Sequence, residues 1–209
     1  LVNTLFLVAA LALTAFWSRT RATESASELN GISWSTVSPA FRRWISVSVI
    51  GTVFLGVTGA LTALGDTLFR ATSLKAGWEQ DFAEGSHFLL RLRVFHPSLA
   101  VGMAIILYLF ADFCSRKLES KPVRFWSKAL QSIVLLQMLV GATNLLLLAP
   151  VTLQIVHLLM ADLAWISLVL LSASSLEALQ LKDGALEPVG MHKEGSTSHP
   201  ALAADHQVS

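Results

Sequence analysis

Two histidines lie inside long apolar stretches of the chain, where an ionisable side chain is a functional candidate by default. His96 stands near the start of one stretch and His157 near the start of another. Each is followed four residues later by an alanine, Ala100 or Ala161, which lies on the same helix face one turn deeper. Two inward-facing imidazoles at similar depth can bind one metal from opposite sides. The pattern therefore predicts the two axial ligands of a heme iron.

The composition indicates the elements that must position these side chains. Of the 209 residues, 54% are hydrophobic and only 14% are charged, which is typical of a polytopic membrane protein. Apolar segments occur at about 1–17, 44–64, 94–114, 129–149 and 152–175. The last four each have the ~20 residues that a membrane crossing requires. The first is shorter, and we expect it to be a helix whose beginning is missing.

The charges between the segments predict an orientation. The connection 115–128 carries five basic residues and one acidic residue, and 18–43 carries four basic and two acidic residues. Both are predicted to be cytoplasmic by the positive-inside bias, whereas the mixed 65–93 connection fits the outside. The net charge of +1 gives no indication of a nucleic-acid partner, and the single cysteine, Cys114, excludes an intramolecular disulfide.

These elements predict an all-α fold, in which the chain is divided into four consecutive parts. Residues 1–17 form one transmembrane helix, 18–43 a cytoplasmic linker, 44–176 an up-and-down four-helix heme-binding bundle, and 177–209 a disordered cytoplasmic tail. The second and fourth helices of such a bundle are commonly diagonal partners, about 12–14 Å apart. His96 and His157 fall on those two helices, a few residues below the outer face.

A porphyrin held between these histidines needs flat space beside the iron. Ala100 and Ala161 would supply it one turn below each ligand. On the other two helices, Gly56, Gly59 and Gly141 would let the macrocycle approach the backbone closely.

The propionates of such a heme would point outward, towards Arg93. This arginine is three residues before His96, so it lies on the same helix face one turn nearer the surface. We therefore predict that Arg93 binds a propionate. The alternative is that Arg93, like Arg70 and Arg91, only holds the helix end at the headgroups.

Other polar residues in the apolar segments have weaker interpretations. The alternative for both histidines is a hydrogen bond to a neighbouring helix. Asn144 and Gln154 flank Pro150 and would bond across helices or orient a ligand histidine. Asp162 is five positions after His157 and so points away from the ligand face.

Several stretches, taken in order, resemble the heme A synthase (cytochrome oxidase assembly) family. They are 51–60, His96 with Ala100, 137–144, and Pro150 followed by Gln154, His157 and Ala161. Together they cover about 40–180, the membrane part after the first segment. The specificity of the resemblance lies in the ordered set, with histidines on alternate helices, rather than in any single stretch.

The resemblance implies eight membrane helices in two similar four-helix halves, each with a histidine pair. This chain would hold the last helix of the first half, preceded by a histidine before Leu1, and all of the second half. His96 and His157 would then bind a heme b cofactor. Heme O, the substrate, would bind in the missing half, which also carries the catalytic residue, so no catalytic residue is expected here.

The implied reaction oxidises the C8 methyl group of heme O to a formyl group for cytochrome oxidase assembly. The implied partners are the membrane, heme O, heme O synthase and an electron donor, and the implied location is the bacterial plasma membrane with a cytoplasmic C-terminus. Many family members have a cysteine pair in an outer loop, whereas 65–93 has none. A non-catalytic membrane cytochrome b that carries electrons is the alternative, and a scaffold bundle without cofactor is a third interpretation.

Overall fold

A computed structural model describes residues 2–21 and 37–184. These residues form six α-helices and the connections between them, with no strand among them. The helices are α1 (Val2–Arg21), α2 (Pro39–Leu68), α3 (Leu74–Asp81), α4 (Phe88–Lys117), α5 (Lys121–Leu146) and α6 (Val151–Gly184). The predicted all-α fold is confirmed. The middle of the predicted linker, most of the predicted tail and the position before Leu1 lie outside the described residues.

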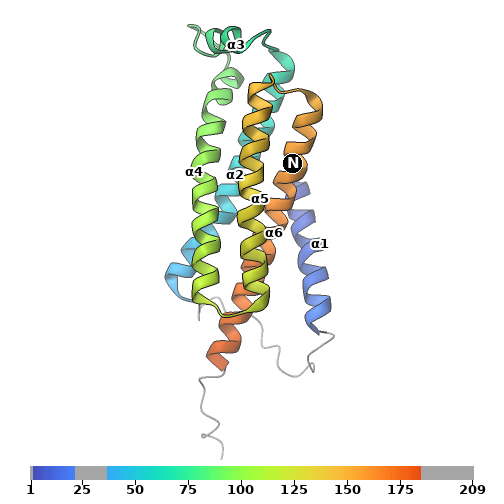
Figure 1. Cartoon of the computed structure of the whole chain (residues 1–209), viewed down its shortest axis with the longest axis vertical. Coiled ribbons are helices and arrows are strands. Elements are labelled where there is room, and N and C mark those ends of the chain that lie inside the picture. The colour runs from blue at the N-terminus through green and yellow to red at the C-terminus, as the bar shows by residue number, and fades with distance from the viewer. Residues whose placement is uncertain (1, 22–36, 185–209) are drawn as a thin grey trace, which may run out of the picture.

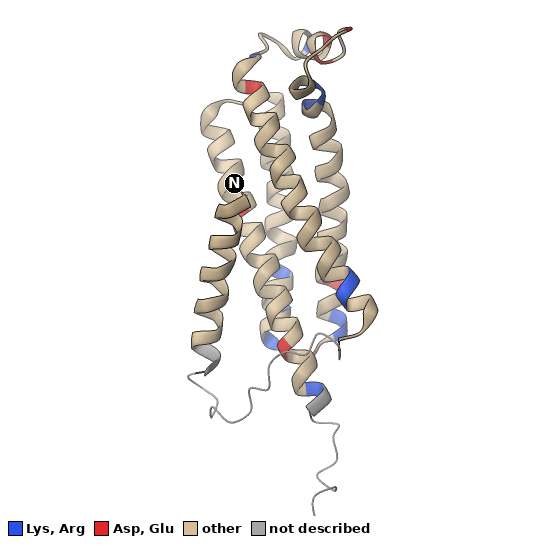
Figure 2. Cartoon of the chain, turned by 180° about the vertical axis from the view of Figure 1, so that it is seen from behind, with Lys and Arg blue, Asp and Glu red and all other residues tan. Residues whose placement is uncertain are grey.

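Four of the helices, α2, α4, α5 and α6, are long and apolar enough to cross a membrane. They run up and down side by side, while α3 lies across one end of the bundle and α1 lies beside the opposite half of α6 (Figure 1). The chain is an integral membrane protein by the length and composition of these four helices. Most described Lys and Arg residues lie at the end opposite α3, as the charge pattern predicts (Figure 2).

Several helices extend beyond the apolar segments that predicted them. The α4 helix begins at Phe88 and ends at Lys117, and α6 continues to Gly184, so that 177–184 are helical where the polar tail was predicted. Hydropathy marks only the part of a helix that lipid surrounds. Polar residues of good helix propensity continue the backbone hydrogen bonds beyond that part.

Local signals account for the starts of α2 and α3 and for the α5–α6 turn. Ser38 and Ser73 accept hydrogen bonds from Phe41 N and Ala76 N, and cap α2 and α3. The α5–α6 turn contains two non-glycine residues with positive φ, Leu148 and Ala149. This left-handed backbone is unfavourable, and the turn is held by hydrogen bonds on both sides: Ala149 N donates to the Asn144 carbonyl (2.7 Å), and Gln154 Nε2 donates to the Ala149 carbonyl (2.7 Å).

The main hydrophobic cluster lies in the half of the bundle away from α3, whereas Leu89 and Leu90 are buried near the α3 end. The core residues with no exposed surface are Phe110, Ala111, Cys114, Val123, Leu130, Leu168 and Leu171. There α1 packs on α6, and Trp165 Nε1 donates to the Leu5 carbonyl at 2.8 Å. In contrast, no residue between 135 and 163 is fully buried. The α3 half of the bundle is thus less tightly filled, and both histidines lie in that half.

The helix order puts α4 and α6 on a diagonal. The α4 helix packs along α2 and α5, α6 packs along α5, and α4 and α6 themselves make few contacts. The first helix of the bundle, α2, also contacts α6 and closes the ring. This arrangement is the one predicted for the second and fourth helices of the bundle.

Candidate functional site

The diagonal helices bring His96 and His157 to similar depth. His96 is eight residues into α4 and His157 six residues into α6, which at 1.5 Å per residue is about 12 and about 9 Å below the helix starts. Both side chains are partly buried. The bundle therefore places two imidazoles from non-adjacent helices in one region.

His96 is seated against α2. A Cβ atom on Gly59 would lie 2.9 Å from His96 Cε1, so only glycine leaves room for the ring. The Thr58 hydroxyl lies 3.1 Å from His96 Nδ1 and donates to the Leu55 carbonyl at 2.9 Å. Because a hydroxyl has one proton, its oxygen then accepts from Nδ1–H of His96. By this hydrogen-bond logic the ring is the Nδ1–H tautomer, whose Nε2 lone pair is free to bind a metal.

His157 is seated against α5 in a matching way. A Cβ atom on Gly141 would lie 2.9 Å from His157 Cε1. The Gln137 amide nitrogen lies 3.3 Å from His157 Nε2, whereas His157 Nδ1 is buried without a hydrogen-bond partner. To bind a metal through Nε2, this ring has to give up its contact with Gln137.

Two further polar atoms, both on α5, are buried without a hydrogen-bond partner: Gln137 Oε1 and Asn144 Oδ1. Buried polar groups in proteins are nearly always hydrogen-bonded, so such atoms mark a place that needs explanation. Together with His157 Nδ1 they lie in the loosely packed half of the bundle. A bound polar or metal-containing group in that half fits this pattern.

Gly59 and Gly141 are predicted from the sequence to let a macrocycle approach the backbone, and in the structure they make room for the two imidazoles. Thr58 and Gln137 are site residues that the sequence did not predict. The available signal was a polar residue within an apolar segment, close to each of these glycines.

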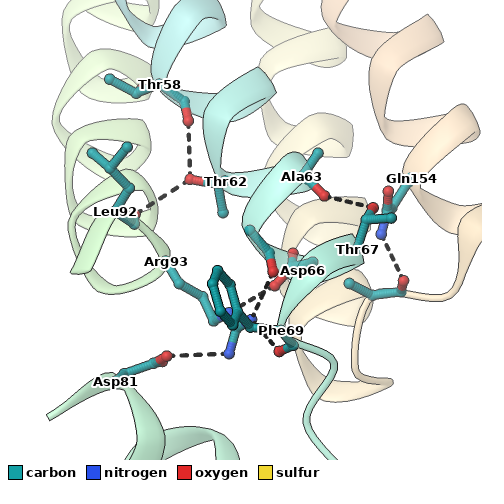
Figure 3. Close-up of polar contacts among 12 residues, drawn as sticks. Thr58, Thr62, Ala63, Asp66, Thr67, Phe69, Asp81, Leu92, Arg93 and Gln154 are labelled. Carbon is teal, nitrogen blue, oxygen red and sulfur yellow. Dashed lines mark hydrogen bonds and ion pairs between the residues drawn. The ribbon is translucent and has the colours of Figure 1, made fainter. Parts of the chain in front are cut away.

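Arg93 lies at the centre of an ion-pair network at the α3 end (Figure 3). Its Nε is 2.7 Å from Asp66 Oδ1 and its Nη1 is 3.1 Å from Asp81 Oδ1. Its Nη2 donates to the Phe69 carbonyl (2.9 Å) and the Gly65 carbonyl (3.4 Å) at the end of α2. The guanidinium thus holds α2, α3 and α4 together.

This network changes the interpretation of Arg93. Its side chain is 10% exposed, and its guanidinium already pairs with two carboxylates and donates to two backbone carbonyls. A heme propionate would have to displace one of these partners, so the propionate role stays a prediction. Burial raises the pKa of the Asp81 carboxyl above its usual value, and the charge of Arg93 opposes that shift.

No group of three or more His, Cys, Asp or Glu residues that could hold a metal ion occurs within residues 2–21 and 37–184. A metal between His96 and His157 would therefore take two ligands from this part of the chain. A heme iron, whose other ligands come from the porphyrin, takes only one or two ligands from the protein. The donor set fits a heme better than a bare metal ion.

Comparison with known proteins decides the family. The family of cytochrome oxidase assembly proteins matches residues 1–169 of this sequence. The chain belongs to this family. The resemblance to the heme A synthase (cytochrome oxidase assembly) family is thereby confirmed, and the matched range includes His96, His157 and the residues that seat them.

Two curated relatives are also similar to this family member. Both are named protoheme IX farnesyltransferase and come from two strains of Thermus thermophilus. Each is 38% identical over 178 residues, which is 85% of this chain and 28% of the relative. The chain thus spans little more than a quarter of the length of the curated relatives it matches. No solved structure matches this sequence.

Proposed function

We propose that this chain is the cofactor half of a heme A synthase, in which His96 and His157 are the axial ligands of a heme b. The complete protein would oxidise the C8 methyl group of heme O to a formyl group. The catalytic residues and the heme O site would lie in the other half. The cofactor half would support that half structurally and deliver electrons to the substrate heme. Membership of the cytochrome oxidase assembly family supports this assignment.

The observation that carries the proposal is the seating of the two histidines. They project from diagonal helices, each fits against a glycine of a neighbouring helix, and Thr58 leaves Nε2 of His96 free. Heme b, when bound, supplies one-electron redox chemistry. The chain's own residues would hold it: Thr58 orients one ligand ring, and Gln137 releases the other.

The name of the two relatives also refers to heme, but it names a farnesyl transfer and not the oxidation of heme O. The region shared with this chain is 28% of each relative. A non-catalytic membrane cytochrome b remains the second candidate, because a two-histidine site in a bundle needs nothing more to carry electrons. The two candidates differ in what the complete protein does to heme O.

The test is heme analysis of the natural full-length protein, purified after expression with a heme supply. Pyridine hemochrome analysis is expected to show heme b, and the reduced native protein is expected to give a low-spin absorption spectrum. Extracted pigments are expected to include heme A when heme O is provided. Heme b without conversion of heme O would favour the cytochrome. The absence of bound heme would contradict both and favour a scaffold.

Thr58 is expected to tune the iron through His96. A hydrogen bond from Nδ1–H makes the imidazole a stronger ligand, and loss of such a partner commonly weakens metal binding about 10–100-fold. We expect that loss in Thr58→Val, together with a higher midpoint potential of the heme. Thr58→Ser keeps the hydroxyl and is expected to restore both values. Heme titration and redox titration measure them, and a Thr58→Val protein with wild-type values would exclude the orienting role.

The two seating glycines are expected to be intolerant of a methyl group. In Gly59→Ala or Gly141→Ala the new Cβ would stand 2.9 Å from a carbon of the ligand ring, so the ring must shift. We expect heme affinity to fall on the order of tenfold or more, as for other changes that misplace a ligand. The matched control is Gly102→Ala on α4, where a Cβ meets nothing within 4 Å. Equal affinity in all three variants would argue against this geometry.

A further inference from the structure

The short helix α3 exposes a ridge of large apolar side chains. Leu74, Trp78 and Phe82 are spaced by four residues, so they lie along one side of the helix and its C-terminal cap. They are 51%, 65% and 57% exposed, and the rings of Trp78 and Phe82 contact each other at 4.6 Å between centroids. A contiguous group of exposed apolar side chains on a helix of eight residues indicates a surface that contacts a membrane or another protein.

The other sides of α3 have different characters. Gly77 and Asp81 are buried against the bundle. Lys75 and Glu79 form an ion pair at 3.8 Å and are 88% and 67% exposed. Around the helix, the apolar ridge therefore lies between a side that faces protein and a side that faces water. This is the arrangement of a helix that lies in a membrane interface.

The ridge is continuous with the lipid-facing surface of α4. Phe82 lines a surface pocket of about 280 Å³ together with Val94 and Phe95. Phe95 belongs to the membrane-spanning helix α4 and is 60% exposed. The apolar side of α3 therefore adjoins the exposed flank of α4, a helix long and apolar enough to cross a membrane.

The α3 helix lies at the end of the membrane-spanning bundle, where the boundary between lipid and water is expected. It lies across the end of the bundle, between the last turn of α2 and the first turn of α4 (Figure 1). The ion pair between Arg93 and Asp81 ties its C-terminal end to α4. Tryptophan is enriched at this level in membrane proteins because its ring is apolar and its N–H is polar.

We propose that α3 is an interfacial helix that inserts Leu74, Trp78 and Phe82 into the lipid leaflet at the α3 end of the bundle. The partner is the headgroup–acyl boundary of the bilayer itself. Lys75 and Glu79 remain in water. This inference does not depend on the heme assignment, because it rests on α3 and the outer flank of α4 alone.

Spin labelling of the full chain in phosphatidylcholine vesicles tests the proposal. Cys114 is fully buried, so the unsubstituted chain serves as the labelling background. Nitroxides are attached in Phe82→Cys and, as the matched control, in Glu79→Cys. The label at 82 is expected to collide several-fold more often with oxygen, which partitions into lipid, than with a water-soluble nickel chelate, and the label at 79 is expected to show the reverse.

Equal accessibility of both positions to the nickel chelate would overturn the proposal and leave the ridge free for a soluble partner. A second measurement needs no cysteine variant. In vesicles of phosphatidylcholine brominated on the acyl chains, the fluorescence that Trp78 contributes, obtained as wild type minus Trp78→Phe, is expected to be strongly quenched. An unquenched difference spectrum would contradict interfacial insertion.

Discussion

His96→Ala and His157→Ala are each expected to abolish the low-spin heme spectrum of the purified protein. Each change would remove one of the two proposed heme ligands, and among the described residues the only other histidine is His87 at the start of α4. The loss should exceed the ~10–100-fold weakening that is typical when only a hydrogen-bond partner of a ligand is removed. Absorption spectra and pyridine hemochrome assays, normalised to protein, measure it.

His87 provides the matched control. It caps α4 by accepting a hydrogen bond from Leu89 N at 3.2 Å, and its ring lies against Phe69. His87→Asn keeps an acceptor at the cap, so helix α4 should be retained. We expect full heme content in this variant. A bis-histidine spectrum that persists in His96→Ala or His157→Ala would rule out the pair as the ligands.

Arg93→Met is expected to destabilise the bundle by about 3–5 kcal/mol, the range found when one partner of a buried ion pair is removed. The change leaves the carboxylates of Asp66 and Asp81, which are 20% and 8% exposed, without their cation. It also removes two donors from the carbonyls that end α2. Unfolding in detergent micelles, followed by circular dichroism during denaturant titration, gives the free energy.

Arg116→Ala is the control for the loss of a guanidinium. Arg116 pairs with Asp112 at 2.8 Å on the surface of α4, with 77% of its side chain exposed. Exposed pairs of this kind contribute about 0–1 kcal/mol. We also expect Asp66→Asn and Asp81→Asn, added to Arg93→Met, to recover part of the loss because they neutralise the orphaned charges. A cost for Arg93→Met no larger than that for Arg116→Ala would contradict the network's role.

Much of the fold could be predicted because it depends on local composition. Each apolar segment of about 20 residues reports its own helix, since a membrane span must satisfy its backbone within the segment. The two histidines stood out for the same reason: an ionisable side chain in an apolar segment is visible without knowing what it touches. Helix ends such as Phe88 and Gly184 were misplaced because hydropathy follows lipid rather than backbone hydrogen bonds.

Composition and residue pattern were enough to predict a helical membrane protein with His96 and His157 at similar depth. The surroundings of these residues became known from the packing of the helices: Thr58 and Gly59 at one ring, Gln137 and Gly141 at the other, and two aspartates around Arg93. These contacts join residues 12 to 38 positions apart. They depend on how neighbouring helices are rotated and offset against each other, and packing across the bundle sets that rotation, whereas hydropathy along one helix does not.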